Sequence, residues 1–116
     1  MTTLAGQQAR GGAVVAPEGR LDALAASALD RELRQALAAA HDGDIVVDMT
    51  RATYVSSSCL RVLLVAARLA RKESRALRLC CLSPRVRQVF ALAGFDMVFP
   101  LHTSRDEALS AGRLGP

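Results

Sequence analysis

Three consecutive serines are the residues of this chain best suited to chemistry. Ser56, Ser57 and Ser58 lie between an apolar segment and a leucine-rich segment. A hydroxyl at a helix start can cap unpaired backbone N–H groups, and the same groups favour a phosphate. The residues alone leave two interpretations open: capping and turn formation, or a site of covalent modification.

The other nucleophiles lack the partners that catalysis needs. Cys59 is placed by a helical wheel of about 100° per residue on the apolar side of its helix, which indicates packing. His41 and His102 are far apart in sequence at the ends of predicted elements, and neither Ser57 nor Cys59 has a base at a matching spacing. Because the chain also has no glycine-rich phosphate loop, we predict that it is not an enzyme.

The sequence predicts no metal or other cofactor. Cys80 and Cys81 are adjacent in a predicted strand, where neighbouring side chains point to opposite faces, so they are not expected to share a metal ion. Asp22, Asp44 and Asp48 are interpreted as cap and turn residues. Three free thiols are typical of a reducing compartment.

Composition limits the remaining classes of function. The 116 residues fit one domain, with half of them hydrophobic and a net charge of +4 in which Lys72 is the one lysine. The charge is compatible with an acidic partner, but a compositional bias toward arginine and alanine is the favoured explanation. Nucleic-acid binding is not expected, because the arginines are scattered and Tyr54 is the one tyrosine. Without a visible signal peptide, and with a longest apolar run of only Val62–Ala67, we expect a cytoplasmic protein.

Strands and helices are predicted to alternate along the chain, which indicates an α/β domain. It is expected to have a mixed sheet of four or five strands and about four helices, which cover one main face of the sheet. Strands are expected near 3–7, 13–17, 45–49, 76–82 and 97–101, with a turn at 19–20. Helices are expected from near Asp22 to a stop at Asp42-Gly43, over 58–73, from the cap Ser83 and Pro84 to Gly94, and from Ser104, with Glu107 completing a capping box, to Gly112.

The second helix is predicted to have one apolar and one basic side. The apolar side has Cys59, Val62, Leu63, Ala66, Leu69 and Ala70. The solvent stripe has Arg61, Leu64, Arg68, Arg71, Lys72 and Arg75. Ser57 lies over the same stripe, so we predict that Ser56, Ser57, Ser58, Arg61, Leu64 and Arg68 bind a partner.

Several motifs in a fixed order resemble the STAS domain family. The segment Ile45–Leu64 reads IVVDMTRATYVSSSCLRVLL, an apolar strand ending in Asp, then a serine-rich loop and a leucine-rich helix. Gly19-Arg20-Leu21-Asp22 is similar to the family's G-x-L-D element. Leu82-Ser83-Pro84, Ala93-Gly94-Phe95 and Ser104–Leu109 resemble its later turns and last helix. The resemblance extends from about Val14 to Leu109, and implies one STAS domain over 1–116 with its core at about 13–110.

The resemblance is to bacterial anti-sigma factor antagonists in particular, and it implies a role for the serines. Family members regulated by partner switching often carry D-S-S/T-G, in which the serine after the Asp is phosphorylated. Here Ser56 stands for the Asp, Ser57 for the phosphorylated serine and Cys59 for the glycine. Ser56 and Ser58 are the less favoured acceptors.

The implied function is to bind an anti-sigma factor, a serine kinase of the GHKL type, and so to release a sigma factor. A PP2C-type phosphatase is a further candidate partner. Two alternatives stay open: a STAS subunit of a membrane lipid-transport ABC complex, and a STAS domain that senses a small ligand.

Overall fold

The computed structural model describes residues 12–114, and a parallel sheet lies at its centre. Its strands lie in the order β1 (Ala13–Val15), β3 (Ile45–Asp48), β5 (Leu77–Cys80) and β6 (Leu101–His102). A second parallel sheet pairs β2 (Gly19–Leu21) with β4 (Ala52–Val55). The strands of the main sheet are rich in aliphatic residues because both of its faces are covered.

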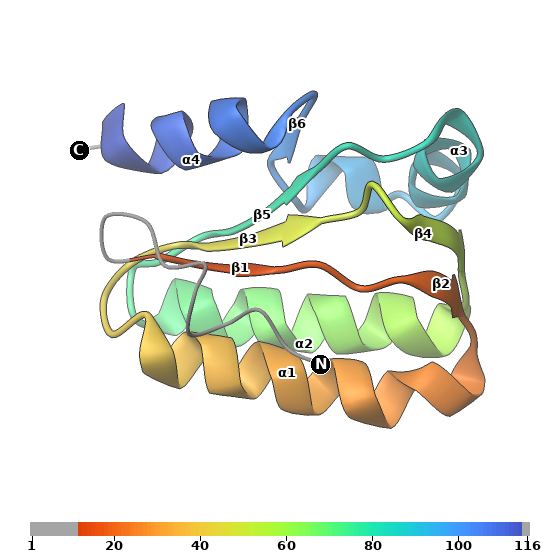
Figure 1. The fold of residues 1–116 in the computed structure, drawn as a ribbon, viewed down its shortest axis with the longest axis horizontal. Coiled ribbons are helices and arrows are strands. Elements are labelled where there is room, and N and C mark those ends of the chain that lie inside the picture. Colours follow the sequence, from red (N-terminus) through yellow and green to blue (C-terminus); the bar gives the residue numbers. More distant parts are fainter. Residues whose placement is uncertain (1–11, 115–116) are drawn as a thin grey trace.

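Helices cover both faces of the main sheet (Figure 1). α1 (Ala26–Ala39) and α2 (Ser57–Lys72) lie on one face, and α4 (Arg105–Leu114) lies on the other. α3 (Pro84–Leu92) packs against β4 at one end of the molecule. The expectation that helices cover one main face was therefore incomplete, because α4 forms a second layer.

Alternation along the strands produces two separate cores. In β3, Ile45 and Val47 face the large cluster under α1 and α2, whereas Val46 faces a small cluster that includes Ala108 of α4. α1 and α2 pack against the sheet through the apolar sides that the sequence predicts. Leu29 and Leu33 of α1 are buried in the main core, as are Leu63 and several alanines of α2.

The α/β class and the four helices are confirmed, and local capping signals located the helix starts well. Ser83 Oγ accepts the Val86 N–H at 3.2 Å, and Gly94 follows α3 with a φ of 78°. Asp22 caps a short 3-10 helix, η1 (Ala23–Ala25), that leads into α1. Ser104 Oγ accepts the Glu107 N–H at 3.0 Å, and Glu107 in turn accepts from the backbone N–H of Thr103.

Other local predictions were wrong. The turn predicted at Gly19-Arg20 is strand β2, and β4 was not predicted at all. The strand predicted over 97–101 is a 3-10 helix, η2 (Phe95–Met97), followed by the shorter β6. Gly112 does not end the last helix, which continues to Leu114. The strand predicted near 3–7 lies outside the described residues, within which every strand pair is parallel.

Candidate protein-interaction site

The three serines lie where β4 ends and α2 begins. Ser56 has an extended backbone and is the N-cap of α2, its Oγ accepting the Cys59 N–H at 3.2 Å. The Ser56 N–H donates to the carbonyl of Leu21 at 2.8 Å, which ties the loop to the end of β2. The short sheet of β2 and β4, missed from the sequence, is therefore what positions the serines.

The three hydroxyls differ in their surroundings. Ser56 is half-buried and occupied as the cap, Ser58 is half-buried, and Ser57, the first residue of α2, is exposed. Within residues 12–114 the Ser57 side chain makes no hydrogen bond. Of the three, Ser57 therefore combines exposure with an uncommitted hydroxyl.

Cys59 is a packing residue, as its position on the helical wheel predicts. It is fully buried, and its Sγ donates to the Asp22 carbonyl at 3.4 Å. Burial raises the pKa of the Cys59 thiol; the hydrogen bond with Ser56 offsets part of this effect, and the charge of Asp22 adds to it. The thiol is therefore protonated at neutral pH and is a poor nucleophile.

The basic stripe predicted on α2 is present, but the predicted positions of Leu64 and Arg75 were wrong. Arg61, Arg68, Arg71 and Lys72 are exposed, and within residues 12–114 none of the four is in an ion pair. Leu64, however, is half-buried and packs against the main core, so it is not an isolated apolar residue in solvent.

Arg75 does not belong to the stripe. Its side chain is only 4% exposed, and its Nη1 donates to the carbonyl of Leu37 at 2.8 Å. The helical wheel fails here because α2 ends at Lys72 and Ser74 adopts a left-handed backbone with φ of 60°, which reverses the chain. Arg75 thus caps the carboxyl end of α1 from inside the fold.

Residues beside the serine loop that were missed from the sequence add apolar and aromatic surface. Leu24 in η1 is 91% exposed, and η1 packs against α2. The guanidinium of Arg20 stacks on the ring of the exposed Tyr54 at 4.3 Å. Figure 1 shows β2, β4 and the starts of α1 and α2 together at one end of the molecule. The cap at Asp22 could have placed Leu24 in an exposed first turn.

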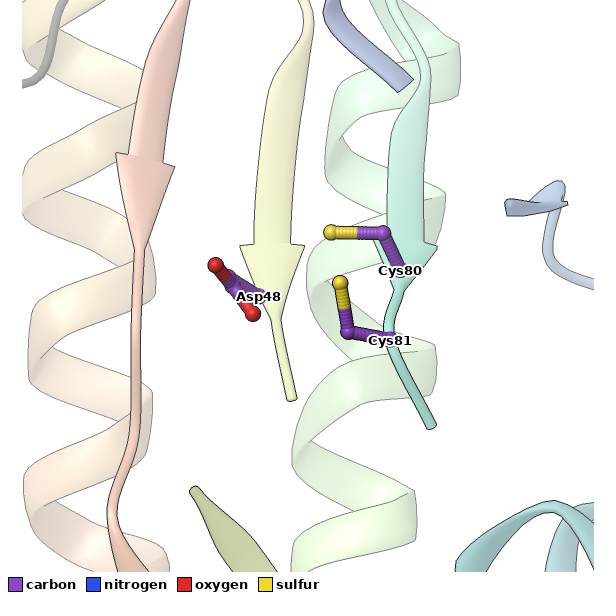
Figure 2. Close-up of side chains that lie close together, drawn as sticks. All are labelled: Asp48, Cys80 and Cys81. Atoms are coloured by element: carbon purple, nitrogen blue, oxygen red, sulfur yellow. The ribbon is translucent and has the colours of Figure 1, made fainter. Parts of the chain in front are cut away.

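Cys80 and Cys81 contradict the expectation that their side chains point to opposite faces. Figure 2 shows both thiols on the side of β5 that faces Asp48, with the Cys81 sulfur beside that of Cys80, and the three potential ligand atoms lie within 4.8 Å of one another. The strand rule fails because Cys81 has a left-handed backbone, with φ of 65°. Asp48 does form the predicted turn, accepting the Thr50 N–H at 3.0 Å.

The two histidines play no part in the serine loop. His102 lies in β6, with its Nδ1 3.6 Å from a carboxylate oxygen of Glu107. His41 follows α1 and lines a groove of about 430 Å³ between α1 and α2.

No helix within residues 12–114 is both long enough and apolar enough to cross a membrane.

Comparison with known proteins identifies the family. The STAS domain model matches residues 6–108. A curated relative, "Putative anti-sigma factor antagonist BtrV" of Bordetella bronchiseptica, is 43% identical over 67 residues, which are 58% of this chain and 58% of the relative.

Solved structures of anti-sigma factor antagonists have the same fold as this chain. An anti-sigma factor antagonist from Mycobacterium paratuberculosis has a TM-score of 0.84 at 26% identity, covering 97% of this chain and 93% of its own. The Bacillus cell fate determinant SpoIIAA, solved in its phosphorylated form, shares the fold with a TM-score of 0.66 at 23% identity, covering 89% and 92%. This chain belongs to the STAS domain family.

Proposed function

We propose that the protein is an anti-sigma factor antagonist that binds an anti-sigma factor through the surface around Ser57. The observation that carries the proposal is the Ser57 hydroxyl at the first residue of α2, which is exposed and makes no hydrogen bond with any residue of 12–114. Arg61, which is in no ion pair within residues 12–114, lies one turn further along α2 and supplies a charge. The exposed Leu24 lies in η1, which packs against α2, and supplies an apolar contact. The names of the relatives support the same role.

The partner proposed is a serine kinase of the GHKL type, which would phosphorylate Ser57 and so release itself. A phosphate adds nearly two negative charges at neutral pH. The first turn of α2 has no acidic residue and presents unpaired backbone N–H groups, so the folded domain tolerates those charges. In the complex the same charges lose their water against a surface that fits a hydroxyl, which opposes binding.

Arg61 would stabilise the phosphorylated form of the protein by binding the phosphate on Ser57. It lies four residues after Ser57, one turn along the same side of α2. A guanidinium there can bind the phosphate and is then withdrawn from the partner. Arg68 and the exposed edge of Leu64 extend the proposed contact along α2. A PP2C-type phosphatase would restore the binding form.

Affinity capture with and without ATP tests the proposal. The immobilised wild-type chain is expected to retain a GHKL-type kinase and to release it after ATP addition, with phosphate on Ser57 by mass spectrometry. Ser57→Ala is the matched variant, and it is expected to retain the kinase in the presence of ATP. Capture of an ABC-transporter ATPase in place of a kinase, with no phosphate on any serine, would overturn the assignment.

A further inference from the structure

Three side chains that could ligate a metal ion meet under α4, on the sheet face opposite α1 and α2. Asp48 ends β3 and Cys80 ends β5, and the two residues are partners in the parallel register. Cys81 follows directly, and its thiol turns to the same side (Figure 2). One carboxylate oxygen and both sulfurs lie within 4.8 Å of one another.

The backbone at Cys81 is what brings the two sulfurs together. In an extended strand, consecutive side chains would lie on opposite faces. Cys81 instead has φ of 65°, a left-handed conformation that is sterically unfavourable for a residue with a Cβ atom. Its N–H donates to the His102 carbonyl at 3.2 Å, which helps to hold the conformation in place.

A direct bond between the two sulfurs is unfavourable at this spacing. Adjacent Cα atoms are about 3.8 Å apart across a trans peptide, whereas disulfides span about 4.4–6.8 Å between Cα atoms. A bridging ion does not impose this constraint, because two thiolates at about 2.3 Å from a tetrahedral zinc ion keep their sulfurs about 3.8 Å apart, whereas a disulfide requires an S–S distance of about 2.05 Å. The pair is better suited to sharing an ion than to forming a disulfide.

The charges around the cluster fit a divalent cation. Asp48 is buried and accepts three hydrogen bonds: Oδ1 accepts from the backbone N–H and the hydroxyl of Thr50, and Oδ2 accepts from Arg105 Nε at 2.9 Å. A divalent ion with two thiolates and one carboxylate carries a single negative charge, which the Arg105 guanidinium balances. Hydrogen-bonded carboxylates of this kind are typical of metal ligands.

We propose that Cys80, Cys81 and Asp48 form a binding site for a thiophilic divalent cation such as Zn²⁺, with Arg105 as the counter-charge. Cys80 is fully buried, but Cys81 and Arg105 are partly exposed, so the ion enters from their side. Binding forms two metal–sulfur bonds and displaces the two thiol protons to solvent. The site is independent of the proposed function, because Ser57 is not part of it.

Titration of the reduced, chelator-treated protein with Cd²⁺ and Zn²⁺ tests the proposal. We expect one ion per chain, a cadmium–thiolate charge-transfer band in the ultraviolet, and release of about two protons, measured by calorimetry in buffers of different ionisation enthalpy. Cys81→Gly removes one thiol and also relaxes the left-handed backbone, so it is expected to fold and to bind at least about tenfold more weakly. Asp48→Asn is expected to weaken binding as well.

Cys59→Ala is the matched control, because Cys59 is buried on the other side of the sheet. It is expected to leave the affinity unchanged. The proposal is overturned if the wild-type protein shows no charge-transfer band, or if Cys59→Ala and Cys81→Gly weaken binding equally.

Discussion

The adjacent residues Ser56 and Ser57 are expected to have separate roles, one in stability and the other in modification. Ser56→Ala removes the cap of α2, which accepts the Cys59 N–H at 3.2 Å. Loss of such a cap costs about 1 kcal/mol of unfolding free energy, which lowers Tm by about 4 °C in a domain of this size. Ser57→Ala removes an exposed hydroxyl with no recorded partner within residues 12–114, so its effect is expected within about 0.5 kcal/mol.

Phosphorylation is expected to depend on Ser57 and not on Ser56, the reverse of their effects on stability. With the cognate kinase and ATP, phosphate is expected on Ser57 in the wild type and in Ser56→Ala, and on no serine in Ser57→Ala. Ser57→Asp places a negative charge at the helix start, which adds about 0.3–1 kcal/mol to the unfolding free energy. The same variant is expected to bind the partner at least tenfold more weakly, or about 1.4 kcal/mol.

Urea unfolding followed by circular dichroism measures the first effect, and mass spectrometry with calorimetric titration measures the second. If Ser57→Ala destabilises the domain as much as Ser56→Ala, the cap has been assigned to the wrong serine. If phosphate is found on Ser58, exposure does not select the acceptor. If Ser57→Asp binds as tightly as the wild type, charge at this position does not control the complex.

Three further predictions concern single side chains. Leu24→Ala is expected to weaken partner binding by more than about 1 kcal/mol at unchanged Tm, while Leu92→Ala, similarly exposed on α3, leaves affinity unchanged; equal affinities for both would refute this. Cys59→Ser is expected to lower the unfolding free energy by about 1 kcal/mol, and Cys59→Gly to keep partner binding; rapid thiol labelling at Cys59 in a Cys80→Ala, Cys81→Ala background would contradict the packing role. Burial alone would raise the pKa of Asp48, but hydrogen bonds, including one from Arg105, hold it below its ordinary value. Its contribution to stability is therefore present above about pH 4 and lost as the pH falls further, so urea unfolding should find Asp48→Asn about 1–3 kcal/mol less stable at pH 7, with the difference shrinking toward pH 3.

The elements that could be predicted from the sequence are those whose signals are local. α3 has its cap, its proline and its terminating glycine within twelve residues, and each acts on its own backbone neighbours. β2 and β4 have no such signals, because a three-residue strand such as Gly19–Leu21 is stable only through its pairing with Ala52–Val55. That pairing joins segments more than thirty residues apart, and short-range patterns carry no information about it.

Two side chains were misplaced for the same physical reason. The position of Arg75 was extrapolated along a regular helix, and that of Cys81 along a regular strand. In both cases a residue with positive φ interrupts the regular geometry: Ser74 before the arginine, and Cys81 itself. Neither is a glycine, so nothing in the residue types marks the change of direction.

Both candidate sites follow the carboxyl ends of parallel strands, and this explains why polar and reactive side chains gather there. Ser56 comes directly after β4, and Asp48 and Cys80 end β3 and β5. Within β1, β3 and β5 most positions are apolar, because helices cover both faces of the main sheet. Where the strands end, the backbone is free to turn and to direct a polar side chain along the edge of the sheet. The serine loop then leads into α2 on one face, whereas Asp48 is bound by Arg105 from α4 on the other. The proposed partner-binding serine and the proposed cation site lie at strand ends of two different sheets, so one small domain can accommodate both without competition for the same side chains.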